Sequence, residues 1–265
     1  MKTPMVIAGP CSPESKEQID YLAKILSRIP GVSAMRAGLW KPRSLPGNFE
    51  GVGEKGLPWL SSVQEIHQIP VATEVILPHH VEQCLKHNIK ILWLGARTTV
   101  NPFYVNEISK ALKGTDVTLM VKNPINPDRK LWLGAIERVM NNGITQPVAV
   151  HRGFSVHNSP HYRNEPLWPL VEDLKAHFPE VPVLLDPSHI TGNSYQIDPL
   201  LYFSPLENYS GMMIEVHEDP KNALSDAAQQ IKPNRLSYLL NKYFTNSDAI
   251  QSIKTTKTTD HLLSK

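Results

Sequence analysis

The chain has 265 residues, 41% of them hydrophobic, with 27 Lys and Arg against 25 Asp and Glu, a formal net charge of +2. This length suits one large domain, and so small a charge gives no argument for a nucleic-acid partner or an anionic membrane. Two cysteines cannot form a disulfide framework, and the sequence shows no signal peptide or membrane span, so we expect a cytoplasmic protein.

Eight short apolar runs alternate with segments of helical spacing along the chain. The runs cover residues 5–8, 32–35, 71–73, 89–94, 117–121, 147–150, 181–185 and 212–214. Helices are predicted after cap residues 12–15 and over 55–66, 78–86, 102–112, 129–141, 166–177, 199–201 and 222–243.

This order predicts a (β/α)8 barrel of the TIM type over residues 1–243. The run 181–185 has no polar residue at alternate positions, which is typical of a parallel strand buried on both faces. An open doubly wound sheet is the alternative, but no Gly-x-Gly-x-x-Gly follows the first run, and eight units in about 240 residues match a closed barrel.

Each run stops near a residue that can do chemistry. In such barrels the carboxyl ends of the strands jointly build one active site. The residues at these ends therefore fall into two groups, one of metal-ligand type and one cationic.

Cys11, His189 and Glu215 follow the first, seventh and eighth runs, and Asp226 comes soon after. These three strand ends are neighbours in a closed barrel, so the four donors could converge on one divalent first-row metal. Each residue alone also has a structural explanation: Cys11 as a small core residue, His189 and Glu215 as a structural pair, and Asp226 as an acid at a helix start.

Six cations lie at or just beyond strand ends two, four, five and six. They are Arg36, Lys41, Arg43, Arg97, Lys122 and Arg152. Facing one mouth, they would repel each other without anionic ligands, so the pattern indicates small polyanionic substrates, more than one of them. A solvated rim is the alternative for Lys41 and Arg43.

Several motifs resemble those of 3-deoxy-D-arabino-heptulosonate 7-phosphate (DAHP) synthase, in its short type I branch, which is grouped with 3-deoxy-manno-octulosonate 8-phosphate synthase. The motifs are Gly9-Pro10-Cys11-Ser12, Arg36-Ala37-Gly38-Leu39-Trp40-Lys41-Pro42-Arg43-Ser44, Gly95-Ala96-Arg97-Thr98, Asp186-Pro187-Ser188-His189, and Glu215-Val216-His217 with Ala223-Leu224-Ser225-Asp226. They occur in the family's order over about residues 5 to 240.

The resemblance implies a metal-dependent enzyme of the shikimate pathway that condenses phosphoenolpyruvate with erythrose 4-phosphate and releases phosphate. The metal, one of Mn, Fe, Co, Zn or Cd, is expected on Cys11, His189, Glu215 and Asp226. The phosphate of phosphoenolpyruvate is expected on Arg97, Lys122 and Arg152, and its carboxylate by Arg36 and Lys41. Arg43 and Ser44 match the site of the aldose phosphate. Lys41, Glu74, Asp186 and His189 are the catalytic candidates.

Two other functions are considered. The octulosonate synthase uses arabinose 5-phosphate, but its branch has Lys-Ala-Asn-Arg-Ser where this chain has Lys41-Pro42-Arg43-Ser44. A non-catalytic regulatory barrel would have lost a ligand or phosphate residue, and none is missing. Asn123-Pro124 and Asn193 depart from the commoner pattern, and we expect them to change loop geometry only.

The remaining expectations concern domains and partners. We expect no N-terminal regulatory domain, and a polar, Thr-rich linker or tail over 244–265 that would join a C-terminal chorismate mutase domain in a longer protein. The resemblance also implies a homo-oligomer, because relatives are commonly dimers or tetramers.

Overall fold

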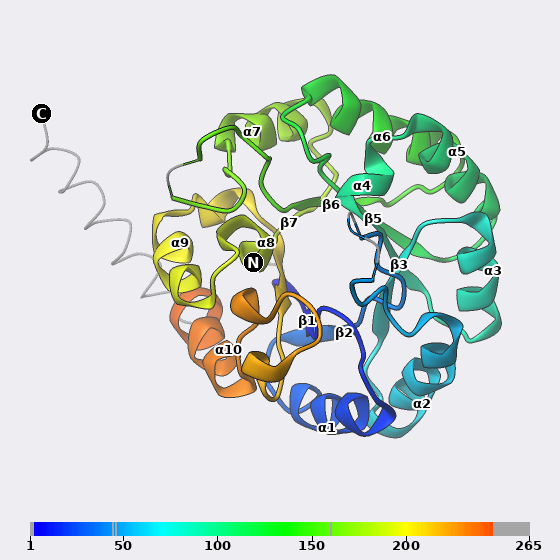
Figure 1. Cartoon of the computed structure of the whole chain (residues 1–265). Coiled ribbons are helices and arrows are strands. Elements are labelled where there is room, and N and C mark those ends of the chain that lie inside the picture. The colour runs from blue at the N-terminus through cyan, green and yellow to red at the C-terminus, as the bar shows by residue number, and fades with distance from the viewer. Residues whose placement is uncertain (1–2, 44, 46, 160, 246–265) are drawn as a thin grey trace, which may run out of the picture.

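The computed structural model describes residues 3–43, 45, 47–159 and 161–245. Eight parallel strands form a closed barrel in sequence order, with β8 paired to β1 (Figure 1). They are β1 (Met5–Gly9), β2 (Val32–Arg36), β3 (Val71–Val75), β4 (Ile91–Leu94), β5 (Thr118–Lys122), β6 (Val148–His151), β7 (Val183–Leu185) and β8 (Gly211–Glu215). Every strand overlaps the apolar run that predicted it, so the predicted (β/α)8 barrel is confirmed.

Helices surround the barrel on its outside (Figure 1). They are α1 (Lys16–Leu26), α2 (Leu57–His67), α3 (Pro78–Lys86), α5 (Pro102–Ala111), α6 (Arg129–Asn141), α7 (Trp168–His177), α9 (Ile197–Phe203) and α10 (Pro233–Leu240). Two further helices of about one turn, α4 (Ala96–Thr99) and α8 (Pro187–Thr191), were not predicted. They directly follow β4 and β7, and they carry Arg97 and His189 at the mouth of the barrel.

Local capping explains why several helix boundaries were predictable. The Asp128 side chain accepts a hydrogen bond from the Leu131 N–H at 2.9 Å and starts α6. Ser15 does the same for α1, accepting from the Gln18 N–H at 3.1 Å. Such side chains satisfy backbone donors that the first turn leaves unpaired. The predicted range 129–141 is correct to the residue. The range 78–86 is also correct, but α3 has no side-chain cap, and its start is marked by Pro78.

The helix predicted over 222–243 is wrong in its first half. The helix α10 begins only at Pro233, and residues 220–222 and 227–229 form isolated 3₁₀ turns. Asp226 has a φ of 48°, in the left-handed region that an α-helix excludes. This segment is therefore a loop over the carboxyl end of β8, and it brings Asp226 to the mouth of the barrel.

The side chains of each strand alternate between two apolar layers. On β4, Trp93 points into the barrel while Leu92 and Leu94 pack against the helices. The inner layer consists of Ile7, Ala34, Ala72, Trp93, Met120, Val148, Val150, Leu184 and Met213. These side chains fill the barrel interior and form the floor of the mouth.

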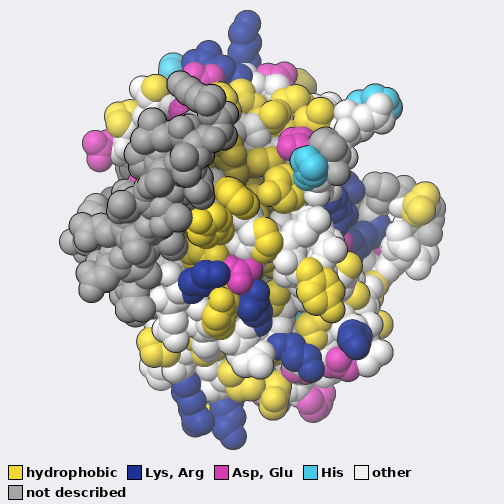
Figure 2. Space-filling view, turned by 90° about the vertical axis from the view of Figure 1, so that its left-hand side faces the viewer, with side chains coloured by type: hydrophobic (Ala, Val, Ile, Leu, Met, Phe, Trp, Pro, Cys, Tyr) yellow, Lys and Arg dark blue, Asp and Glu magenta, His cyan; other side chains and the backbone are white. Residues whose placement is uncertain are grey.

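The face that carries α9 and α10 combines apolar side chains with a small ion-pair network (Figure 2). Phe203 and Tyr238 are exposed there. Asp198 of α9 lies 2.8 Å from Arg235 and 2.9 Å from Lys242, which joins α9 to α10 and to the turn that follows it. The last helix is thus held to the barrel just before the described residues end.

His151, at the end of β6, does not face the mouth. Its ring is fully buried between the strand and the helices, among Trp132, Phe154 and Trp168, and its Nδ1 lies 2.8 Å from the Tyr209 hydroxyl. Burial lowers the pKa of His151 to about 3. The folded protein therefore holds this imidazole neutral at pH values where an exposed histidine is charged.

We expect the free energy of unfolding to decrease as pH falls from about 6.5 toward 3. In this window the unfolded chain protonates His151 and the folded chain does not, which costs about 1.4 kcal/mol per pH unit. Urea unfolding at pH 7, 6 and 5 should show a shallower pH dependence for His151→Phe than for the wild type. His177→Phe, at an exposed position of α7, is the control. Equal slopes for His151→Phe and the wild type would contradict this explanation.

Cys11 and Cys84 are both buried free thiols. Among the residues that the structure describes, no helix has the length and apolarity to cross a membrane. Ser44 and residues 246–265, which hold most of the predicted linker, lie outside the described residues.

Candidate active site

A cleft opens at the carboxyl ends of the strands. It is lined by Lys41, Pro42, Arg43, Glu74, Trp93, Gly95, Ala96, Arg97, Lys122, Arg152, His189 and Asp226. The structure thus brings together eight of the residues that the sequence predicted for the site, from strand ends two to eight. Ser44, predicted beside Arg43, lies outside the described residues.

Four other predicted residues lie in a fully buried layer beneath this cleft: Cys11, Arg36, Asp186 and Glu215. Arg36 does not share the cleft surface with the other cations. Its Nη2 lies 3.1 Å from Glu215 Oε1, and its guanidinium lies over the Trp93 ring, 5.0 Å from the centroid. Its Nη1 is buried without a hydrogen-bond partner among the described residues.

The expectation that six cations repel each other in one mouth therefore needs correction. Besides Arg36, three more have carboxylate neighbours. Lys122 lies 2.9 Å from Asp186, the Lys41 ammonium lies 3.9 Å from Glu74, and Arg43 lies 3.4 Å from Asp226. Pairing inside the protein balances these charges at close range, where a low local dielectric makes it effective. The cleft surface stays net positive, because its lining has more Lys and Arg side chains than the two carboxylates of Glu74 and Asp226.

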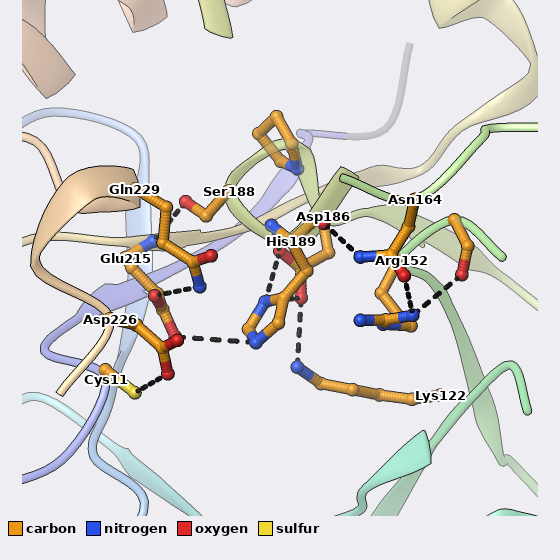
Figure 3. A network of polar contacts seen from close by, with 12 residues as sticks. Cys11, Lys122, Arg152, Asn164, Asp186, Ser188, His189, Glu215, Asp226 and Gln229 are labelled. Atoms are coloured by element: carbon orange, nitrogen blue, oxygen red, sulfur yellow. Dashed lines mark hydrogen bonds and ion pairs between the residues drawn. The ribbon is translucent and has the colours of Figure 1, made fainter. Parts of the chain in front are cut away.

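A buried chain of hydrogen bonds links Lys122 to His189 through Asp186 (Figure 3). Lys122 Nζ donates to Asp186 Oδ2 at 2.9 Å, and His189 Nδ1 lies 3.0 Å from Oδ1 of the same carboxylate. Burial alone would raise the pKa of Asp186, but His189 and Lys122 hold it well below its ordinary value. Asp186 is thus an anion that orients the imidazole, with Nε2 turned to Glu215 at 3.7 Å.

The four predicted metal donors converge on one side of the site (Figure 3). Cys11 Sγ donates to Asp226 Oδ2 at 3.1 Å, and His189 Nε2 faces Glu215 Oε1. Burial and the neighbouring Glu215 raise the pKa of the Cys11 thiol to about 12. Within the described residues, Glu215 Oε1 is buried without a hydrogen bond, although it has the ion pair with Arg36.

These donors fit a divalent metal in their chemistry. As the side chains lie, no group of three or more His, Cys, Asp or Glu among the described residues is arranged to hold an ion. A thiol, an imidazole and two carboxylates nevertheless form the mixed donor set that first-row divalent ions accept. The buried Glu215 Oε1 is paired with Arg36 at 3.1 Å but accepts no hydrogen bond from the described residues, so it keeps a lone pair for a metal ion. Binding would require Cys11 to lose its proton, so affinity for a metal would rise with pH.

The opposite side of the site is built around Arg152, directly after β6. Its backbone N–H donates to Asn123 Oδ1 at 2.7 Å, and its Nη1 donates to Asn164 Oδ1 at 2.8 Å. Burial lowers the pKa of Arg152 to about 10, so the guanidinium stays charged at neutral pH. Arg97, on α4, lines the same cleft from an exposed position.

Sequence reasoning missed several residues that shape the site. Trp93 stands in an apolar run, so the sequence indicates a core residue. In the structure two cations lie over its ring: the guanidinium of Arg36, and Lys122 Nζ at 5.8 Å from the ring centroid. Gln229 donates to Glu215 Oε2 at 2.7 Å and accepts from Arg163 at 2.8 Å. The adjacent pair of glutamines after Asp226 was the available signal, since buried amides need partners.

Together, the closed parallel barrel and its cationic cleft at the strand ends define an enzyme that acts on small anionic substrates. Sequence comparison agrees. The profile of the DAHP synthetase I family matches residues 2–252, and the chain belongs to this family.

Individual relatives give the same result. The chain is 30% identical over 245 residues to the phospho-2-dehydro-3-deoxyheptonate aldolase of Thermotoga maritima, covering 92% of this chain and 70% of that protein. The crystal structure of phospho-2-dehydro-3-deoxyheptonate aldolase (DAHP synthase) from the same organism superposes with a TM-score of 0.81 at 28% identity, over 93% of this chain and 69% of the other. A truncated form of the DAHP synthase from T. maritima superposes with a TM-score of 0.78 at 26% identity, over 93% of this chain and 87% of the other.

The family and its reaction are therefore as predicted from the sequence: the condensation of phosphoenolpyruvate with erythrose 4-phosphate in the shikimate pathway.

Proposed function

We propose that this chain performs the DAHP synthase reaction in the cleft at the strand ends, with one divalent metal as cofactor. The observation that carries the proposal is the division of one mouth into two halves. Cys11, His189, Glu215 and Asp226 lie on one side, and Lys122 and Arg152 lie on the other. The aldehyde requires the metal-binding half and the anionic enol phosphate requires the cationic half, and the two must lie side by side for the substrates to react.

The cationic half would bind phosphoenolpyruvate. Lys122, Arg152 and Arg97 are the residues for its phosphate, because guanidinium and ammonium groups donate charge-assisted hydrogen bonds to such oxygens. Lys41 would bind the carboxylate from the cleft wall. Arg36 would assist from below, and its buried Nη1 without a partner among the described residues supports this role.

The aldose phosphate would lie at the outer edge of the cleft, on Arg43 and Ser44. Arg43 is held there by its Nε, which donates to the Phe49 carbonyl at 2.9 Å, and by Asp226, 3.4 Å from its Nη1. Its guanidinium lines the cleft and keeps further N–H groups for a ligand.

A divalent metal held by Cys11, His189, Glu215 and Asp226 would act as a Lewis acid on the aldehyde oxygen of erythrose 4-phosphate. Asp186 fixes the His189 ring by accepting from Nδ1. Burial alone would lower the pKa of Lys41, but Cys11 and Glu74 raise it, so its Nζ is charged and can donate to the oxygen that becomes negative. Glu74 keeps this ammonium at the cleft wall.

The chemistry that these side chains would support balances as follows. Carbon 3 of phosphoenolpyruvate forms a bond to the aldehyde carbon, one water adds at carbon 2, and phosphate leaves. The protein's contribution is to hold two phosphates in reacting positions and to stabilise the developing charge.

An activity assay after metal removal is the test of this proposal. Chelator-treated protein should not turn over phosphoenolpyruvate and erythrose 4-phosphate, and Mn, Fe, Co, Zn or Cd should restore phosphate release. Cys11→Ser should require a much higher metal concentration for the same rate, because a hydroxyl is a poorer ligand for these ions than a thiolate. Full activity of Cys11→Ser after chelation would refute the ligand assignment.

Arabinose 5-phosphate in the same assay tests the octulosonate alternative. We expect erythrose 4-phosphate to be strongly preferred, because Pro42 and Arg43 follow Lys41 in this chain. A preference for arabinose 5-phosphate would reverse the substrate assignment, and no turnover of either sugar by metal-loaded protein would favour the non-catalytic barrel. A cytoplasmic location, a homo-oligomer and a C-terminal chorismate mutase domain stay predictions.

A further inference from the structure

The segment that follows β6 leaves the barrel after Phe154 and returns to it at Glu165. Phe154 and Glu165 form an antiparallel bridge, each N–H donating to the other's carbonyl at 2.8 Å. The returning strand also contacts α8, because the Asn164 N–H donates to the Ile190 carbonyl at 3.0 Å. The backbone of Asn164 is thus fixed from two sides, beside Arg152 and His189, which line the mouth.

The Asn164 side chain joins the two halves of the site (Figure 3). Its Oδ1 accepts from Arg152 Nη1 at 2.8 Å, and its Nδ2 donates to the His189 carbonyl at 2.7 Å. The orientation of the amide is determined by its partners, since a guanidinium can only donate and a carbonyl can only accept. With 5% of its surface exposed, Asn164 makes both contacts away from bulk water.

Two glycines allow this segment to approach the site. Gly153 has a φ of +75°, and a Cβ there would lie 2.6 Å from the Asn164 carbonyl oxygen. Gly192 has a φ of +64°, and its Cβ would lie 2.6 Å from Cβ of Arg163. The glycines that follow β6 and α8 therefore leave room for the backbone of residues 163–164.

The neighbouring Arg163 contacts the other half of the site. Its Nη1 lies 3.2 Å from Asp226 Oδ1 and 2.8 Å from Gln229 Oε1. One dipeptide therefore contacts both the proposed metal-binding half and the phosphate-binding half. The hydrogen bond from Arg152 to Asn164 is buried, whereas those of Arg163 are partly buried or exposed, so the contact with Arg152 carries the inference.

We propose that Asn164 is a positioning residue that holds the Arg152 guanidinium in the orientation that binds the phosphate of phosphoenolpyruvate. Asn123 fixes the backbone of Arg152. Asn164 fixes the end of its side chain together with the Gly153 carbonyl, which accepts from the same Nη1 at 3.1 Å. The Nε and Nη2 groups have no hydrogen-bond partner among the described residues and are left for a ligand in the cleft that Arg152 lines. A freely rotating arginine would lose rotamer entropy on binding, whereas this one is ordered in advance. The proposal rests on the assignment of Arg152 to phosphoenolpyruvate made above.

The test uses metal-loaded full-length protein and direct titration of phosphoenolpyruvate, together with KM values for both substrates. Asn164→Ala should weaken phosphoenolpyruvate binding about tenfold or more, because a hydrogen bond to a charged group is lost. The KM for erythrose 4-phosphate should change less than twofold. Asn142→Ala, which removes two side-chain hydrogen bonds at the end of α6, is the matched control and should leave both KM values unchanged.

A double-mutant cycle with Arg152→Met separates positioning from general structural support. If Asn164 acts through Arg152, Asn164→Ala should add less than twofold to the loss that Arg152→Met already causes. A full tenfold further loss in that background, or an equal rise in the KM of erythrose 4-phosphate, would overturn the proposal. Should Asn164→Ala fail to fold, Asn164→Ser takes its place in the cycle and must meet the same criteria.

The titration distinguishes this proposal from the proposed function. Wild-type protein that binds phosphoenolpyruvate but turns over neither aldose phosphate would refute the function and still allow the cycle to be completed. Unchanged binding by Asn164→Ala in an active enzyme would refute the positioning role alone.

Discussion

Replacing Arg36 by methionine should reduce the free energy of unfolding by about 3–5 kcal/mol. Arg36 and Glu215 have no exposed side-chain surface, and their charges lie 3.1 Å apart. Without the guanidinium, the Glu215 carboxylate stays buried with Gln229 as a neutral donor. His189 cannot replace the lost charge at pH 7, because burial lowers the pKa of its imidazole. Urea unfolding of metal-free protein at pH 7 measures the difference.

The double variant Arg36→Met with Glu215→Gln is the control for this prediction. It removes both charges, so most of the lost stability should return, as expected when a buried pair is replaced as a unit. A loss below about 1 kcal/mol for Arg36→Met alone would be typical of exposed ion pairs and would show that water reaches Glu215. Circular dichroism at pH 7 would establish that both variants keep the native fold.

The barrel itself could be predicted because its strands are buried on both faces. Such strands read as continuous apolar runs, and Pro, Asp and Ser mark the starts of several helices between them. The helix predicted over 222–243 was partly wrong because burial of apolar residues does not by itself indicate a helix. Apolar residues in this loop, such as Ile231, are buried against the barrel, but Asp226 adopts a left-handed backbone and ends any helix there. The spacing of apolar residues in the sequence does not show that one residue has a left-handed backbone.

The composition of the site was also predictable, because chain topology brings all strand ends to one edge. The direction of individual side chains was not. His151 and Arg152 are adjacent in sequence, yet the pleat of β6 sends His151 outward to the helices, while Arg152 lies in the mouth. Arg36, at the end of β2, is buried beneath the cleft because Glu215 and Trp93 hold it there.

Residues such as Asn164 were beyond the reach of sequence patterns for another reason. Its place depends on the bridge between Phe154 and Glu165 and on its contact with α8, both of which form only in the folded chain. An asparagine in an irregular loop has no periodicity to indicate burial. Its hydrogen bonds to two distant elements are visible only once the barrel is assembled.

Replacing Lys122 by methionine should lower kcat/KM by about 10²–10³-fold. The variant loses a cation at the proposed phosphate position and also leaves Asp186, which is fully buried, without the donor at 2.9 Å. Since Asp186 orients His189, both halves of the site are disturbed by one change. Steady-state kinetics of metal-loaded enzyme should show a larger rise in KM for phosphoenolpyruvate than for erythrose 4-phosphate.

Two further variants decide whether this loss arises from the site. Lys122→Arg keeps the charge and a donor, so it should recover part of the activity, limited by the larger guanidinium in a buried position. Lys90→Met removes a lysine whose ion pair with Asp116 is exposed at the surface, and it should change kcat/KM less than twofold. A Lys122→Met enzyme with more than a tenth of wild-type kcat/KM would exclude Lys122 from the phosphate site. Its ion pair with Asp186 would then have a structural role, measurable as a loss of thermal stability without a change in substrate binding.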